Sequence, residues 1–292
     1  MANISTYKET FKSFYQDETT YPINNHSFKV GDRVDAIYGT AFVRDQSGNI
    51  IYTAAGNPLQ APTDISNRSL LGYANPDYSF GINNKFAYKN LSFSFQFDGR
   101  IGGKIYDRVY YQSMNGGTAW ESANGDYGAA RLKEWQSTNN GTVAATPAFI
   151  GKGVVITSGT PIFANGQITN LSALGFAPNT TAVTVQSYLS SGLGSNFDEY
   201  YMIDRSFVKL REVTLGYSLP ASVLKGGFIK AATFSLIGRN LLYFAKRKDM
   251  DVDQFAAGYN AADRSLSGAN GGSQGLSSVT ARRFGFNINL SF

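Results

Sequence analysis

The chain has 292 residues, a hydrophobic content of 42% and a formal net charge of +5, so it is long enough to bury a core and is not intrinsically disordered. It contains no cysteine, which excludes a disulfide framework and a thiolate metal site. Its Lys and Arg residues form no block of the kind that binds nucleic acid, so we expect no nucleic-acid partner.

Hydropathy and aromatic content bear on membrane insertion. No run approaches the roughly 18 apolar residues of a transmembrane helix, and the first residues, MANISTYKETF, lack the apolar region of a signal peptide. The absence of such a run does not exclude the strands of a membrane β-barrel, because each of these needs only about 9–11 alternating residues. The 18 Tyr, 21 Phe and 31 Gly fit such a barrel, which has aromatic girdles and many turns.

The first half of the chain predicts a strand and a hairpin. Residues 30–43 (VGDRVDAIYGTAFV) alternate sufficiently to predict a strand that ends in a turn at 45–48. Residues 78–103 predict a hairpin with a tight turn at Lys89 and Asn90. In its returning strand, Phe93, Phe95 and Phe97 share one face, and the opposite face is polar throughout.

Three further strands are predicted in the second half, at 206–220, 232–244 and 281–292. In the first of these, Leu215 and Tyr217 lie on an apolar face, whereas Glu212 and Thr214 lie on a polar one. The last strand alternates in the same way, with Ile288 and Leu290 among its apolar positions. Helical periodicity is weak, except in pieces such as 128–135, so the chain is predicted to be all-β.

The lengths of the connections alternate strictly. Two residues join the hairpin strands and a short link follows 206–220, whereas 45–77, 106–206 and 245–278 are long. Outer-membrane barrels have short periplasmic turns and long outer loops, and a β-sandwich needs no such asymmetry. We therefore expect an antiparallel meander whose polar faces line a lumen and whose aromatic faces meet lipid.

Several stretches resemble the C-terminal third of the SusC/RagA family of TonB-dependent outer-membrane transporters. They are SFVKLREVTLGYSLP, IGRNLLYF, the RRFGFNINLSF ending, the hairpin region 75–107 and residues 30–52. The last strand also resembles the signal that barrel-assembly machinery recognises, and this signal is carried by Arg283, Gly285, Ile288, Leu290 and Phe292.

The resemblance implies that residues 1–292 are the C-terminal part of a 22-stranded transmembrane barrel, of which about six strands are present. The plug domain, the TonB box and the first sixteen strands have no counterpart in this sequence, so we expect a split gene product or a segment of a longer polypeptide. The implied partners are the rest of the barrel and its plug, a SusD-like surface lipoprotein, outer-membrane lipid, and the TonB complex acting through that plug.

The implied function is active import of nutrient oligomers, glycan or peptide, across the outer membrane of a Gram-negative cell, without enzymatic activity. One alternative is a passive structural or adhesive barrel fragment, and another is a soluble carbohydrate-binding β-sandwich. The only histidine, His26, lies in a polar stretch, and we expect no catalytic residue.

The long excursion between 106 and 206 carries the candidate binding residues. They are Tyr110, Tyr111, Trp120, Tyr127, Trp135, Tyr200 and Tyr201. Aromatic side chains of this kind suit stacking on sugars, gripping peptide or packing against a partner lipoprotein. We expect the excursion to be ordered and to pack against neighbouring barrel loops or a lipoprotein, with Trp120 or Trp135 buried.

Asp249, Asp251 and Asp253 form an alternating acidic stretch that could gather oxygen ligands around calcium. No closing Glu and no obligatory Gly follows them, so a solvated loop start is the alternative. No firm metal site and no other cofactor is expected.

Overall fold

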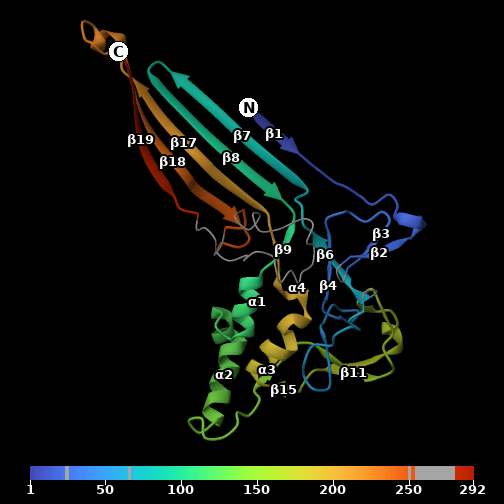
Figure 1. The fold of residues 1–292 in the computed structure, drawn as a ribbon. Helices are drawn as coiled ribbons and strands as arrows, with labels where there is room; N and C mark the ends of the chain where they lie inside the picture. The colour runs from blue at the N-terminus through green and yellow to red at the C-terminus, as the bar shows by residue number, and fades with distance from the viewer. Residues whose placement is uncertain (24–25, 65–66, 249–250, 254–279) are drawn as a thin grey trace.

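The computed structural model describes residues 1–23, 26–64, 67–248, 251–253 and 280–292. A long antiparallel sheet extends away from a globular part made of short strands and helices (Figure 1). The sheet has six strands, and each pairs with the next one in the sheet order: β1 (Ala2–Ser5), β7 (Tyr78–Tyr88), β8 (Leu91–Ile101), β17 (Phe207–Ser218), β18 (Ala231–Ala245) and β19 (Arg283–Ser291). These strands form the predicted meander.

The two ends of the sheet differ in their connections. Lys89 and Asn90 join β7 to β8, and a short link containing α5 (Ala221–Leu224) joins β17 to β18 at the same end (Figure 1). The long connections from β1 to β7 and from β8 to β17 both lie at the opposite end, where they form the globular part. The predicted alternation of short and long connections is therefore confirmed for these four links.

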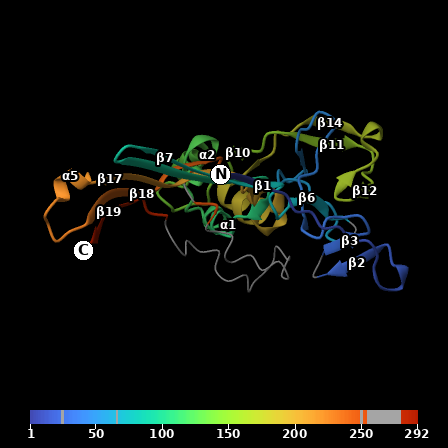
Figure 2. The same cartoon turned by 90° about the horizontal axis from the view of Figure 1, so that it is seen from above.

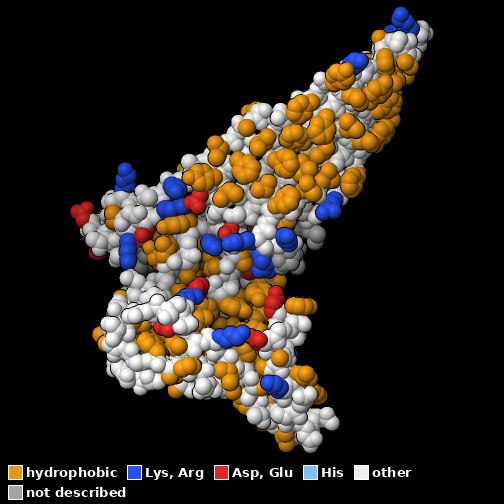
Figure 3. Space-filling view, turned by 180° about the vertical axis from the view of Figure 1, so that it is seen from behind, with side chains coloured by type: hydrophobic (Ala, Val, Ile, Leu, Met, Phe, Trp, Pro, Cys, Tyr) orange, Lys and Arg blue, Asp and Glu red, His pale blue; other side chains and the backbone are white. Residues whose placement is uncertain are grey.

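The register places the apolar residues of successive strands on one face. Leu215 pairs with Phe93 of β8 on one side and with Leu236 of β18 on the other. Phe234 pairs in turn with Ile288 of β19. Because directly paired residues project on the same side of a sheet, these side chains form a continuous apolar band, which is visible in Figure 3.

The opposite face is polar. Ser94 pairs with Thr214, and Arg239 donates to Glu212 over 2.8 Å between Nε and Oε2. The predicted separation of polar and apolar residues is thus confirmed over most of the sheet, with Ile237 on the polar face and Asn84 on the apolar face as exceptions. Within the described residues the apolar face stays uncovered, since Leu215, Leu236 and Phe286 are 47%, 58% and 60% exposed.

Two irregularities interrupt the alternation. In β17 the pairing with β8 steps from Leu210 to Glu212 while β8 advances by one residue, so Arg211 is the extra residue of a β-bulge. In β18 the pairing skips Asn240, which has a left-handed φ of 53°, together with Leu241. This second irregularity explains why the sequence of β18 alternates less clearly than that of its neighbours.

The predicted strand at 30–43 is wrong. Only β4 (Ala36–Gly39) forms there, and it pairs with β6 (Ser69–Tyr73) in the globular part instead of joining the long sheet. All four residues of β4 are buried, so the segment is a core strand with no solvent-exposed face. Its place in the sheet is taken by β1, after which the chain enters the globular part directly.

The globular part interleaves the two long connections. Its remaining strands and helices are β2 (Thr20–Ile23), β3 (His26–Lys29), β5 (Ile51–Tyr52), β9 (Lys104–Tyr106), α1 (Arg108–Asn115), α2 (Gly125–Ser137), β10 (Phe149–Ile150), β11 (Val154–Ser158), β12 (Phe163–Ala164), β13 (Gln167–Ile168), β14 (Gly175–Pro178), β15 (Ala182–Val183), α3 (Val185–Ser187), α4 (Asp198–Tyr201) and β16 (Met202–Asp204), with short 3-10 turns at Tyr15–Asp17, Trp120–Ala123, Leu171–Ala173 and Gly194–Asn196 and a π-helical turn at Tyr188–Leu193. β5 from the first connection pairs with β11 from the second, so the two fold together.

Figure 2 shows the same arrangement from above, with β2, β3, β12 and β14 on the side of the molecule opposite to α5. The helix α2 contains the stretch for which helical periodicity was predicted. Within the described ranges, no helix is long and apolar enough to cross a membrane.

Candidate functional site

An aromatic pocket of about 540 Å³ opens in the globular part. Its aromatic lining consists of Phe42, Tyr52, Tyr110, Trp120, Tyr127, Phe149, Tyr188 and Tyr200. Glu121, Asn124, Asp126 and Lys152 also line it, so charged and amide groups accompany the rings. Both long connections contribute, because Phe42 and Tyr52 precede β7 whereas the others follow β8.

The rings of the pocket support one another. Phe149 lies 4.6 Å from Tyr188 and 4.8 Å from Tyr127, measured between ring centroids. Tyr110 and Tyr200 stack with centroids 6.3 Å apart. Such contacts between aromatic rings stabilise by about 0.5–1.5 kcal/mol each beyond area burial, so most of the walls are fixed before any ligand arrives.

Acidic side chains of α4 position the wall that comes from the first long connection. Asp198 accepts a hydrogen bond from the backbone N–H of Thr40 at 2.9 Å, and Glu199 accepts one from that of Phe42 at 2.8 Å. Glu199 also pairs with Arg44 at 2.7 Å. These bonds hold Phe42 beside Tyr200, with ring centroids 6.3 Å apart.

At the other wall, Asp107 caps α1 by accepting a hydrogen bond from the backbone N–H of Tyr110 at 2.9 Å. The guanidinium of Arg247, just beyond β18, pairs with this buried carboxylate at 3.2 Å and lies 5.4 Å from the Tyr110 ring centroid. The pocket wall is thereby connected to the end of the long sheet.

Tyr127 and Tyr188 keep their hydroxyl protons at neutral pH. Burial raises the pKa of Tyr127 above its ordinary value, and the neighbouring Tyr200 raises it further. Burial also raises the pKa of Tyr188, with a contribution from Tyr52, whose hydroxyl lies 3.2 Å from that of Tyr188. The pocket therefore offers π faces and neutral hydroxyl groups rather than phenolate charge, which suits stacking on sugar or peptide groups.

Four of the residues named from the sequence, Tyr110, Trp120, Tyr127 and Tyr200, meet at this pocket. Tyr201 is fully buried behind it, and its hydroxyl has no hydrogen-bond partner among the described residues. Tyr111 packs against Tyr201, with ring centroids 5.1 Å apart. These two residues belong to the core that supports the pocket rather than to its surface.

Trp135 lies apart from the aromatic pocket. It lines a second cavity of about 610 Å³ together with Asn115, Arg131, Glu134, Gln186 and Leu189. Within this chain the expected burial of a tryptophan is not seen, since Trp120 is 74% exposed and Trp135 is 59% exposed. The excursion is ordered, as expected, and it packs on the first long connection.

Sequence reasoning missed Phe42, which was assigned to a sheet strand, and Tyr52, which lies in the long connection 45–77, from which no candidate residue was chosen. Their only signal was the aromatic residue type. Phe149 lies within the excursion, but nothing local distinguished it from the other aromatic residues there.

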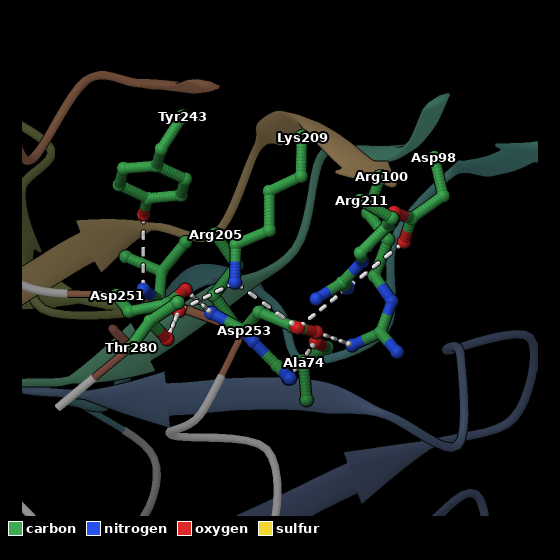
Figure 4. Close-up of polar contacts among 11 residues, drawn as sticks. Ala74, Asp98, Arg100, Arg205, Lys209, Arg211, Tyr243, Asp251, Asp253 and Thr280 are labelled. Atoms are coloured by element: carbon green, nitrogen blue, oxygen red, sulfur yellow. Dashed lines mark hydrogen bonds and ion pairs between the residues drawn. The ribbon is translucent and has the colours of Figure 1, made fainter. Parts of the chain in front are cut away.

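The acidic stretch contacts cationic side chains (Figure 4). Asp251 pairs with Lys209, and Asp253 accepts from Arg211 Nη2 at 2.7 Å. Asp249 lies outside the described residues. Among the residues that are described, no group of three or more His, Cys, Asp or Glu side chains has the spacing to hold a metal ion.

The residues that resemble an assembly signal lie in or next to β19. Arg283 and Gly285 fall on its polar face, opposite Arg239 and Ile237, whereas Ile288 pairs with Phe234 on the apolar face. Leu290 is also on the apolar face, and Phe292 follows the strand, with its ring centroid 5.1 Å from that of Phe228.

Comparison with known proteins identifies relatives of this chain. No protein-family model matches it. Among curated proteins, it is similar to TonB-dependent receptor P3 of Formosa agariphila, with 23% identity over 248 residues, which is 85% of this chain and 19% of the relative. It is also similar to TonB-dependent receptor P26 of the same organism, with 26% identity over 205 residues, which is 70% of this chain and 16% of the relative.

The chain thus spans less than a fifth of the length of these curated relatives, at 19% and 16%. Among solved structures, it is similar to one described as the RagAB peptide transporter, with 19% identity, a TM-score of 0.45 and coverage of 85% of this chain and 23% of that one. A second, the RagAB peptide importer in an open-open state, gives 17% identity, a TM-score of 0.46 and the same coverage. The curated relatives confirm the resemblance to TonB-dependent receptors that the sequence motifs indicate.

Proposed function

We propose that this chain is a C-terminal segment of the barrel wall, with its outer loops, of a SusC/RagA-type TonB-dependent transporter that imports nutrient oligomers across the outer membrane. The single observation that carries the proposal is the sheet itself. Its six strands form an antiparallel meander with one apolar face, one polar face and long connections at one end. Those are the properties of an outer-membrane barrel wall.

The apolar face supports a lipid environment. Large apolar side chains from β7, β8, β17, β18 and β19 are exposed on it, among them Phe86 at 54%, Phe93 at 40% and Phe284 at 80%. Soluble monomers rarely expose a contiguous apolar patch larger than a few hundred Å², because the contact of apolar surface with water is unfavourable in free energy. In lipid the same face needs no cover, while the polar face would line the lumen.

The globular part supports a role in capture at the outer surface. In an outer-membrane barrel the long connections lie outside the cell, so the aromatic pocket would face arriving substrate or a SusD-like lipoprotein. Its stacking surfaces and neutral hydroxyls are compatible with either glycan or peptide. Energy would come from the TonB complex acting on a plug domain elsewhere in the transporter, and this segment would supply wall and loops without enzymatic chemistry.

The alternatives are less well supported. A soluble carbohydrate-binding sandwich needs a second sheet over the apolar face, and no such layer lies on it among the described residues. A passive or adhesive barrel would share the wall, but the similarity to TonB-dependent receptors favours active import. Calcium at Asp249, Asp251 and Asp253 is the weaker alternative to the ion pairs of Asp251 and Asp253, and a chelation experiment would distinguish the two.

The proposal is tested by expressing the complete transporter in a Gram-negative outer membrane and by following uptake of labelled oligosaccharide and oligopeptide pools. We expect a heat-resistant barrel and uptake of one pool that stops when the inner-membrane proton gradient is dissipated. Uptake that persisted without the gradient would favour the passive barrel. A chain that stayed soluble without detergent would favour the sandwich.

A further inference from the structure

Lys209 is an ammonium group buried on the polar face of β17, with a side chain only 1% exposed. Removing a lysine charge from water costs several kcal/mol unless countercharges replace the lost hydration. Here Asp251 contacts Nζ directly and Asp253 lies 3.3 Å from it. The aromatic rings of Phe207 and Tyr243 complete the surroundings, each with its centroid 5.3 Å from Nζ.

Asp251 lies near the beginning of the connection between β18 and β19, and it contacts a residue at the end of the same connection. The oxygen that contacts Lys209, Oδ2, also accepts a hydrogen bond from the hydroxyl of Thr280 (Figure 4). Asp251 follows β18 in the sequence, whereas Thr280 precedes β19. One carboxylate oxygen of Asp251, near the start of the connection, therefore contacts both Thr280 at its end and Lys209 of β17.

Val252 reinforces this attachment. Its side chain is 1% exposed and packs with Ile105, Ile203 and Phe207 in a small apolar cluster. Its backbone N–H donates to the hydroxyl of Tyr243 at 3.0 Å. In the segment 251–253, the central apolar side chain therefore packs in an apolar cluster, whereas the two flanking carboxylates pair with cationic side chains.

Three cations of the site pair with three carboxylates. Lys209, Arg211 and Arg100 face Asp98, Asp251 and Asp253, and these side chains come from β8, β17 and the connection. Burial would raise the pKa of Asp253, but the hydrogen bond and charge of Arg211, with the charge of Lys209, outweigh it and lower that pKa. The carboxylate therefore stays ionised in this setting, and so can keep its cationic partners.

We propose that Lys209, Asp251 and Thr280 form a clamp that holds both ends of the β18–β19 connection against β17. Among the described residues of the connection, 251–253 and Thr280 are thereby attached to the wall at one place. The clamp goes beyond the proposed transport function and does not depend on which substrate, if any, is carried.

This chain contains no cysteine, so a single-thiol experiment requires replacement only of any cysteine elsewhere in the complete protein. In the complete protein in detergent micelles, Val252→Cys reports burial of the base through its rate of maleimide labelling. A nitroxide on Ala281→Cys reports the mobility of the chain beside Thr280. We expect Asp251→Ala to raise the labelling rate at position 252 at least tenfold and to mobilise the nitroxide at position 281.

Glu212→Ala is the matched control, because it removes a carboxylate that pairs with Arg239 at 2.8 Å on the same strand and face. It should change neither reading. If Asp251→Ala exposed position 252 but left the label at 281 unchanged, the two-ended clamp would be wrong. If Asp251→Ala fails to assemble, Thr280→Val provides a milder test, because it removes only one hydrogen bond. We expect Thr280→Val to mobilise the label at position 281 in an assembled barrel. An unchanged label at that position would overturn the proposal. Uptake plays no part in these readings, so failure of the transport proposal would leave them interpretable.

Discussion

The rings of Phe228 and Phe292 pack together with their centroids 5.1 Å apart at the end of the sheet that carries the short connections. Beside them, the backbone N–H of Lys230 donates to the carbonyl of Ser291 at 2.7 Å. The end of β19 is thus attached to the link between β17 and β18 by a ring contact and a hydrogen bond. The ring at position 292 packs against Phe228, and we propose a second, separable role for it in recognition by assembly machinery.

Substituting the two rings separates these roles. We expect Phe292→Ala to lower the amount of assembled, heat-resistant barrel several-fold without changing synthesis, because the strand resembles an insertion signal. Phe228→Ala removes the same ring contact and should have a much smaller effect. Band shifts of unheated samples in gel electrophoresis measure the assembled fraction, and equal losses in both variants would reduce the role of Phe292 to packing.

An introduced charge should destabilise the barrel far more on one face of β17 than on the other. Leu215→Lys places an ammonium group on the apolar face and should destabilise the barrel by about 2–4 kcal/mol if it lies near the bilayer midplane. Thr214→Lys places the same group on the polar face and should cost far less. Urea unfolding in lipid vesicles compares the two, and equal destabilisation would show that this face does not meet lipid.

Trp120 is predicted to contribute to capture. Because its side chain is 74% exposed at the pocket, Trp120→Ala should leave the fold intact while lowering affinity for the captured ligand or lipoprotein about tenfold. Trp135→Ala is the control, since this residue is similarly exposed but lines another cavity. Titration calorimetry with the captured ligand or the lipoprotein measures the change, and a larger loss with Trp135→Ala would move the binding surface to the second cavity.

Alkaline pH should weaken the globular part. The folded pKa values of Tyr127 and Tyr188 are raised, so their contribution to stability is complete below the unfolded pKa of about 10 and is lost as pH rises through the folded values. Tyrosine absorbance and thermal unfolding between pH 9 and 12 would show late ionisation with falling stability. Tyr127→Phe removes one of the ionising groups and should reduce that fall; an unchanged pH dependence would contradict the assignment.

Calcium is expected to be dispensable at the acidic stretch, because Lys209 and Arg211 already neutralise Asp251 and Asp253. Chelation should therefore leave the labelling rate of Val252→Cys unchanged. A rate that increased on chelation and recovered with calcium would instead establish the site suggested by the spacing of the three aspartates.

The long strands could be predicted from the sequence because each has one face in a different environment from the other. That difference imposes a period of two, and the pattern of residues 206–220 preserves it over most of β17. The same criterion failed at β4, which is buried on both faces, so its residue types carry no information about sheet membership. Burial on both sides removes the signal on which the prediction depends.

The site could be predicted only in part for a different reason. Tyr110, Tyr127 and Tyr200 were named because they lie in one conspicuous excursion, but Phe42 is joined to them by folding of a distant segment. Likewise, 42 positions separate Lys209 from Asp251. Neither residue type nor local spacing indicates such pairings, which depend on the three-dimensional path of the connections.

The bulge at Arg211 reverses which residues of β17, odd-numbered or even-numbered, lie on the apolar face. Toward the short connections, the apolar positions of β17 are odd, as at Val213 and Leu215; on the other side of the bulge they are even, as at Val208 and Leu210. The strand therefore contains two patterns in opposite phase, and the shift turns Lys209 toward its carboxylates. If Arg211 were instead paired in a regular ladder without the bulge, strict alternation from Leu215 would place Lys209 on the apolar side. One extra residue lets the same strand form a wall along one part of its length and an ionic anchor along the other.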